Sequence, residues 1–269
     1  MNIRGLFFLT LATVLIWGGC KGPEGPEPER SATLDLGFSP QSSGLAFFPE
    51  EAYENHDGQR FMLERFRFLI SDLRLVDKDG GEDVLVDYAL VDFTSSSLRT
   101  PDTLINGATN MELEIVPGTY ETLKFNIGVP AERNNGNPAE FPEDHPLSIR
   151  QGLHWTWSSG YIFLQIDGRL DTTINDEGEL EQAFIYHAGT NDLMRAMEFS
   201  LNDLVLDEDG VAEYRLEVDV NRTFFNDTEG IDMKVDNLTH STPVGSDAFN
   251  LAERVMNNFA NGAWSLERQ

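Results

Sequence analysis

The chain has very little cysteine, with one residue in 269. A lone thiol excludes an internal disulfide framework, and it excludes the cysteine-rich zinc sites and iron–sulfur clusters that need several thiolates. Any metal bound by this chain must therefore rely on other donors. Neutral imidazole is the strongest nitrogen donor that remains.

Positive charge is also scarce. The chain carries 19 Lys and Arg against 46 Asp and Glu, which gives a formal net charge of -27 at pH 7. Nucleic acid binding depends on cationic side chains that release counterions from phosphates, so this composition argues against a nucleic acid partner. The hydrophobic fraction of 40% is ample for a folded core and excludes a disordered acidic chain.

Long hydrophobic runs are limited to one short segment at the start of the sequence. Arg4 is followed by an apolar run from Leu6 to Trp17, and then by two glycines and Cys20. The run is too short to span a bilayer of about 30 Å, and this order of charge, apolar run and small residues is typical of an export signal. We predict a bacterial lipoprotein signal peptide at 1–19, with Cys20 as the lipidated N-terminus. The alternative is a membrane anchor with an incidental cysteine.

The residues that follow predict a tether and one folded domain. Residues 20–30 are rich in Pro, Gly and Glu, a composition that favours extended conformers and cannot bury apolar surface. The folded domain is predicted to cover residues 31–269. This organisation predicts a lipid-anchored protein of the bacterial cell envelope, on the periplasmic side or at the cell surface.

The hydrophobic pattern has mostly a period of two, which indicates strands. Leu34, Leu36 and Phe38 alternate with polar residues, and the apolar face of residues 65–76 changes phase near Ser71, which predicts a β-bulge. Residues 111–116 and 123–129, joined by a Pro-Gly-Thr turn, predict a hairpin.

Only one segment has helical spacing. After Ser246 as the N-cap, apolar residues recur every three or four positions until Asn261 and Gly262. Many short strands and one helix near the end of the chain predict an all-β protein, an antiparallel β-sandwich with a C-terminal α-helix.

Known catalytic signatures are absent from the sequence. It contains no phosphate-binding loop, dinucleotide fingerprint, nucleophile elbow or His-Glu-x-x-His pair. We therefore expect a binding protein rather than an enzyme, and we assign no catalytic residue.

One segment, residues 144–161, is unusually rich in rings. It holds two of the four tryptophans and two of the five histidines, including His154, Trp155 and Trp157, together with Tyr161. The tryptophans are either core residues, the commonest fate of aromatic side chains on strands, or the lining of a site to which imidazoles contribute metal ligands. The pattern alone leaves both interpretations open.

A set of segments distributed from about residue 34 to residue 259 resembles the MbnP-like family of exported copper-binding proteins. These segments are 65–76 (RFRFLISDLRLV), 117–120 (PGTY), 125–129 (FNIGV), 145–147 (HPL), 152–157 (GLHWTW), 159–161 (SGY), 186–189 (YHAG), 218–221 (VDVN) and 239–240 (TH). Their combination in this order carries the resemblance.

The resemblance implies a β-sandwich with a copper site built largely from histidine, beside a tryptophan that is oxidised to kynurenine. It also implies an oxidising partner, an MbnH-like di-haem cytochrome c peroxidase. Carried over to this sequence, it suggests His187, His240 and then His154 as metal ligands, and Trp155 or Trp157 as the modified residue. Some members have a histidine in or just after the first strand, whereas residues 34–48 contain none.

A second hypothesis needs no metal. Trp155, Trp157 and Tyr161 would form a stacking platform for a glycan or another ligand at the surface. This hypothesis requires exposed rings, which a structure can test.

Overall fold

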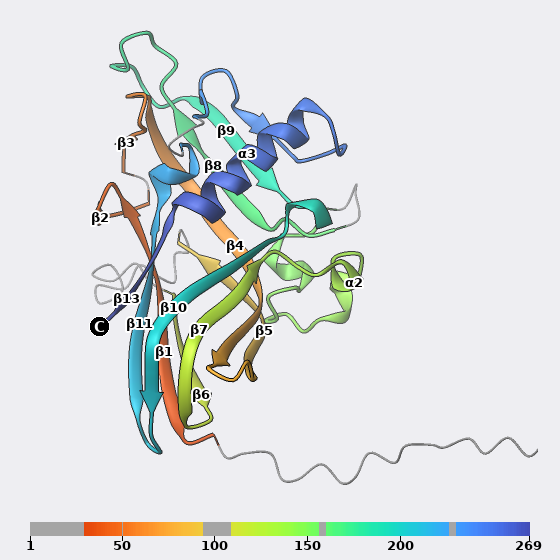
Figure 1. The fold of residues 1–269 in the computed structure, drawn as a ribbon. Helices are drawn as coiled ribbons and strands as arrows, with labels where there is room; N and C mark the ends of the chain where they lie inside the picture. Colours follow the sequence, from red (N-terminus) through yellow and green to blue (C-terminus); the bar gives the residue numbers. More distant parts are fainter. Residues whose placement is uncertain (1–29, 50, 94–108, 156–159, 226–229) are drawn as a thin grey trace, which may run out of the picture.

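A computed structural model of the chain describes residues 30–49, 51–93, 109–155, 160–225 and 230–269 (Figure 1). Cys20, Trp157, the predicted signal peptide and the predicted tether up to residue 29 lie outside the described residues. Within the described ranges, no helix has both the length and the apolar character that crossing a membrane requires.

The described strands form two sheets. In the smaller sheet the order is β13-β11-β1-β2, and β6 also pairs with β1. Its members are β1 (Ala32–Ser42), β2 (Leu45–Ala46), β6 (Thr109–Ile115), β11 (Val211–Asp219) and β13 (Trp264–Arg268).

In the larger sheet the order is β10-β7-β4-β8-β9-β12, and the long strand β4 also pairs with β3 and β5. Its members are β3 (Tyr53–Glu54), β4 (Arg60–Asp77), β5 (Glu82–Asp92), β7 (Gly118–Ile127), β8 (Leu164–Leu170), β9 (Gln182–Ala188), β10 (Arg195–Leu206) and β12 (Leu238–Thr239). The helices are α2 (Ala131–Asn134), α3 (Asp247–Gly262) and short 3-10 turns at Pro138–Glu140, Ile149–Gln151, Asn191–Leu193 and Val220–Thr223.

The predicted β-sandwich with a C-terminal helix is confirmed. Most strand pairs are antiparallel, but β1 pairs with β11 and β9 pairs with β12 in parallel. Parallel partners cannot be joined by a tight turn and are distant in sequence. For this reason local patterns did not indicate these two pairs.

The predicted bulge in the long strand β4 is also present. Asp72 has a positive φ of 62°, and the pairing with β7 shifts between Ser71 and Arg74. The extra residue changes which side chains face inward, so that Leu73 and Leu75 remain buried after the bulge.

The predicted hairpin of residues 111–116 and 123–129 is wrong. The two strands form, but β6 pairs with β1 in the smaller sheet, whereas β7 pairs with β4 and β10 in the larger one. The turn between them therefore connects the two layers of the sandwich. Both strands need one buried face, and each finds it against the core between the sheets.

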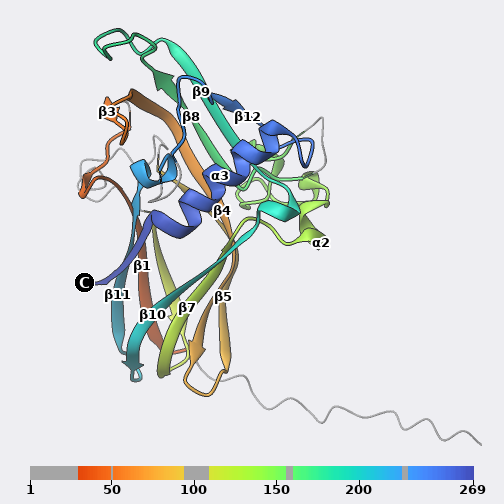
Figure 2. The same ribbon diagram turned by 45° about the horizontal axis from the view of Figure 1, so that its top comes forward.

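The core lies between the sheets and is closed by α3 (Figure 2). Phe68 of β4 contacts Phe38 of β1 and Phe259 of α3, with ring centroids 6.3 and 5.2 Å apart. As predicted, Ser246 caps α3, accepting a hydrogen bond from the Phe249 N–H at 3.2 Å, and the helix ends at Gly262. The strand β13 that follows was not predicted.

The two ends of the sandwich differ. In Figure 1, β1 begins at the lower end, whereas β8, β9 and α3 lie in the upper part. The long segment between β7 and β8 packs beside β4. Arg67 of β4 donates a hydrogen bond from Nη1 to the carbonyl oxygen of Gln151 in this segment, at 3.0 Å. This segment carries His154 and Trp155 to the neighbourhood of β8 and β9.

Candidate metal centre

Two of the predicted ligands, His187 and His240, lie side by side. His187 is the penultimate residue of β9, and His240 directly follows β12. Because β12 pairs in parallel with β9, with Thr239 opposite Tyr186, the next residue of each strand is brought level with the other. The two imidazole centroids are 5.1 Å apart, with their planes at 54°.

A row of polar side chains supports His187 from the neighbouring strands. In the strand register Gln165 of β8 lies opposite both Arg67 of β4 and His187 of β9. Two residue pairs further along, Asp167 of β8 lies opposite Arg65 of β4. His187 Nε2 is 2.6 Å from Asp167 Oδ1, so the imidazole contacts a carboxylate on the side of β8.

The surroundings favour an ionised Asp167 carboxylate and a neutral His240 imidazole. Burial acts to raise the pKa of Asp167, but the hydrogen bond and charge of His187, together with Arg65, outweigh it and hold the pKa below its ordinary value. Burial lowers the pKa of His240, and the neighbouring His187 lowers it further. Neutral imidazole is the form that binds a metal.

Trp155 packs close to the same place. Its side chain is 6% exposed, and its ring atom Cη2 lies 3.0 Å from where a Cβ at Gly189 would be. Gly189 is two residues after His187, and it is tied to Ser241, the residue after His240. The Gly189 N–H donates to Ser241 Oγ at 3.0 Å, and the Ser241 hydroxyl donates to the Gly189 carbonyl at 2.6 Å. The indole is thereby fixed beside the segments that carry both histidines.

The histidine pair has a spacing that suits a shared metal ion. An imidazole bound at about 2 Å puts its centroid about 3 Å from the metal, so two imidazoles on one ion have centroids at most about 6 Å apart. The observed 5.1 Å is within that limit. Among the described residues no group of three or more His, Cys, Asp and Glu side chains could hold a metal ion. The pair therefore offers two protein ligands.

His154, the third predicted ligand, is not brought to this pair. It forms an isolated antiparallel bridge with Tyr161, and its ring packs edge-on against that of Tyr161 at 4.9 Å. Adjacent residues on an extended segment point to opposite sides, so His154 and Trp155 face different surroundings. Burial lowers the pKa of His154.

The stacking-platform hypothesis is wrong for the two rings that the structure describes. Trp155 is 6% exposed and Tyr161 is 1% exposed, so neither presents a face on which a glycan could stack. The Tyr161 hydroxyl donates to the Leu147 carbonyl at 2.8 Å, which anchors it in the interior. Trp157 lies outside the described residues.

Sequence patterns did not indicate three residues of this region: Gln165, Asp167 and Ser241. Their only local signals are polar residues within or next to apolar runs. The Asp-Gly pair at 167–168 is typical of a hairpin turn, yet it lies inside β8. The strand pairing, rather than any motif, gives these residues their place beside His187 and His240.

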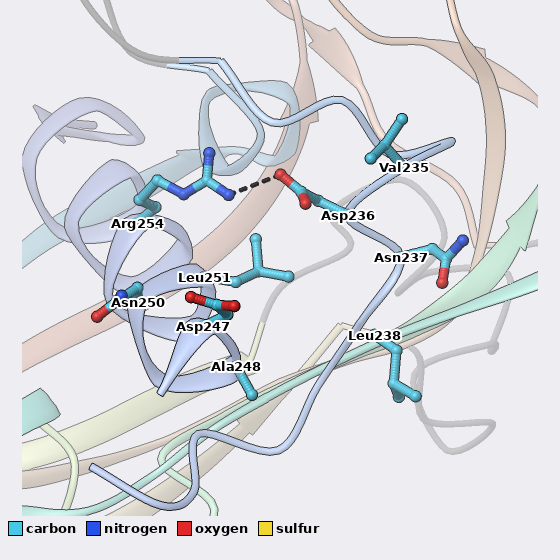
Figure 3. Close-up of a pocket in the computed structure, with 9 residues that line it drawn as sticks. All are labelled: Val235, Asp236, Asn237, Leu238, Asp247, Ala248, Asn250, Leu251 and Arg254. Carbon is cyan, nitrogen blue, oxygen red and sulfur yellow. Dashed lines mark hydrogen bonds and ion pairs between the residues drawn. The ribbon is translucent and has the colours of Figure 1, made fainter. Parts of the chain in front are cut away.

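A cavity of about 590 Å³ lies nearby, between residues 235–238 and α3 (Figure 3). Arg254 and Asp236 form an ion pair at 2.6 Å in its wall, so their charges are matched. Neither histidine of the pair is among the nine residues that line it. We therefore treat the cavity as separate from the candidate centre.

The fold and this region together define a β-sandwich protein that brings two histidines from different strands together beside a buried tryptophan. The family model described as MbnP matches residues 31–242, and the chain belongs to that family. The fold is similar to the solved structure of MbnP from Methylosinus trichosporium, with a TM-score of 0.56 and 16% sequence identity. That alignment covers 88% of this chain and 99% of the other. No curated protein matches the chain significantly.

Proposed function

We propose that this protein is an exported copper-binding protein of the MbnP type, in which His187 and His240 hold copper beside an oxidised Trp155. The observation that carries the proposal is the convergence of the two imidazoles, with centroids 5.1 Å apart, from strands that are distant in sequence. Imidazole is a ligand that suits copper. The single cysteine of the chain lies outside the described residues, so few other strong copper ligands are available.

Trp155 is the better supported of the two candidates for oxidation. Its ring packs against Gly189. Gly189 forms two hydrogen bonds with Ser241, the residue after His240. Kynurenine has a carbonyl and an amine that tryptophan lacks. Its formation at Trp155 would add a donor next to a centre that otherwise has two protein ligands.

The oxidant must come from elsewhere, because opening an indole ring needs a strong oxidant and this chain has no cofactor motif able to supply one. An MbnH-like di-haem cytochrome c peroxidase is the proposed partner. Lipidation at Cys20 would hold the protein in the bacterial cell envelope, on the periplasmic side or at the cell surface.

Copper analysis of the full chain purified from its native host tests the ligand assignment. We expect one copper ion per chain, and loss of copper from both His187→Ala and His240→Ala. The matched control is His56→Ala, because His56 also contacts a carboxylate, Asp57, at 3.0 Å and stacks on a ring, Phe225, at 3.9 Å. Unchanged copper content in either ligand variant would refute the assignment.

Peptide mass spectrometry of the same protein tests the modification. Conversion of tryptophan to kynurenine changes the mass by a small, defined amount at one residue, which we expect at Trp155. An unmodified Trp155 in copper-loaded protein from the native host would show that the copper site does not depend on its oxidation.

A further inference from the structure

Asp167 is held beside His187 by contacts with three side chains. It is 7% exposed, and each carboxylate oxygen has defined neighbours. Oδ2 accepts from Gln165 Nε2 at 2.9 Å and from Arg65 Nη1 at 3.2 Å, whereas Oδ1 is 2.6 Å from His187 Nε2. The Arg65 guanidinium and the Gln165 amide NH₂ can only donate, so Asp167 Oδ2 accepts both hydrogen bonds.

Arg67 fixes the orientation of the Gln165 amide. Arg67 Nε lies 2.5 Å from Gln165 Oε1, and a guanidinium can only donate. The amide oxygen must therefore face Arg67, which turns the amide nitrogen toward Asp167 and His187. The orientation follows from the hydrogen-bond network rather than from the shape of the amide.

The location of the His187 proton follows from these contacts. Gln165 Nε2 is also 3.2 Å from His187 Nε2, and an unprotonated Nε2 could accept from it. In that arrangement, however, a nitrogen lone pair would face a carboxylate oxygen at 2.6 Å, which is repulsive. A proton on Nε2 instead makes a short charge-assisted hydrogen bond to Asp167.

We propose that Asp167 is a positioning residue that keeps the His187 proton on Nε2 and leaves Nδ1 as the nitrogen that binds a metal, an inference that rests on the proposed function. Strand order agrees with this assignment, since β8 and β12 flank β9 on opposite sides. Asp167 contacts the imidazole from β8, and His240 lies at the end of β12. A carboxylate that orients a ligating histidine in this way typically raises metal affinity.

Long-range nitrogen–proton NMR correlations of His187 in the metal-free full chain test the proposal directly. We expect the Nε2–H tautomer in the wild-type protein at a pH where the imidazole is neutral. A wild-type His187 that carries its proton on Nδ1 would overturn the proposal. This measurement needs neither copper nor a variant, so it decides the question even where a variant does not fold.

Asp167→Asn gives the sharpest perturbation. An asparagine has one acceptor oxygen, and the Oδ2 position faces two donors, Gln165 and Arg65. We expect the amide oxygen to take that position and the amide NH₂ to face His187, which reverses the tautomer and puts the proton on Nδ1. Copper affinity, measured by competition with a chromophoric copper(I) chelator, is expected to fall about 10- to 100-fold.

The matched control is Asp57→Asn, because Asp57 forms the other described carboxylate contact to a histidine, His56, at 3.0 Å. This variant should leave both the His187 tautomer and the copper affinity unchanged. An Asp167→Asn protein with wild-type tautomer and wild-type affinity would overturn the proposal. Failure of the wild-type chain to bind copper would instead remove the proposed function, while the tautomer measurement would still report on Asp167.

Discussion

Replacing Gly189 by alanine is expected to destabilise the protein and to displace Trp155. A Cβ at this position would overlap the carbonyl oxygen of Tyr161 and approach Trp155 Cη2 to 3.0 Å and Ile162 Cα to 3.1 Å. Two of these contacts are with backbone, which cannot rotate away as a flexible side chain can. Two hydrogen bonds to Ser241 hold the Gly189 backbone in place. The Gly189 backbone therefore cannot easily move away from these contacts.

The expected cost is about 3 kcal/mol, the upper end of the usual penalty for overpacking. For a domain of this size this corresponds to a fall of roughly 6–12 °C in Tm. Urea unfolding followed by circular dichroism measures the free energy. The matched control is Gly118→Ala, whose Cβ would have the Tyr120 side chain as its nearest neighbour, at an ordinary 3.5 Å. This variant should stay within about 0.5 kcal/mol of wild type.

A Gly189→Ala protein as stable as the Gly118→Ala control would refute the described packing of Trp155. A destabilised protein that retains full copper affinity would show that the indole can move without disturbing the histidine pair.

Three further predictions concern the supports of this region and of the helix. Burial raises the pKa of Tyr161 to about 12 from its ordinary 10.0; the unfolded chain therefore loses this proton first, and stability falls between these two pH values. Tyr161→Phe should lessen that alkaline loss, while costing about 1 kcal/mol at neutral pH because the Leu147 carbonyl loses its donor. Asn134→Ala should cost about 1–3 kcal/mol because it leaves the buried Tyr161 N–H, now bonded at 2.7 Å, without its acceptor. Ser246→Ala should cost about 1 kcal/mol by removing the cap on the Phe249 N–H.

Each of these three predictions is checked by denaturant unfolding, the first at several pH values. An alkaline loss as steep in Tyr161→Phe as in wild type would contradict the cause given for it. Asn134→Ala or Ser246→Ala proteins with wild-type unfolding free energies would show that water replaces the lost acceptor at no net cost.

Much of the fold could be predicted because it is local. The alternating strands, the bulge near Ser71 and the capped helix after Ser246 each depend on residues within one element. The turn after β6 was wrongly predicted to form a hairpin because its Pro-Gly-Thr sequence fits one. Nothing within the segment shows that its two strands join different sheets. The short strand β13 was missed because its five residues have too little pattern to be distinguished from a chain end.

The candidate site divides in the same way. His187 and His240 were found through segments that resemble a family, but their proximity depends on the parallel pairing of β9 with β12. The sequence did not predict Asp167 as part of the site, because an Asp-Gly pair favours a turn and not the interior of a strand. Gly168 is nevertheless required inside β8, since a Cβ there would overlap the Met62 carbonyl and lie 2.6 Å from the Phe184 ring.

The position of the first described residues has a consequence for how the molecule would be presented. The start of β1 lies at the end of the sandwich remote from β9 and α3 (Figure 1). Any anchor attached ahead of Arg30 would hold the molecule by that end. The strand β9, which carries His187, would then lie at the end of the sandwich remote from the point of attachment.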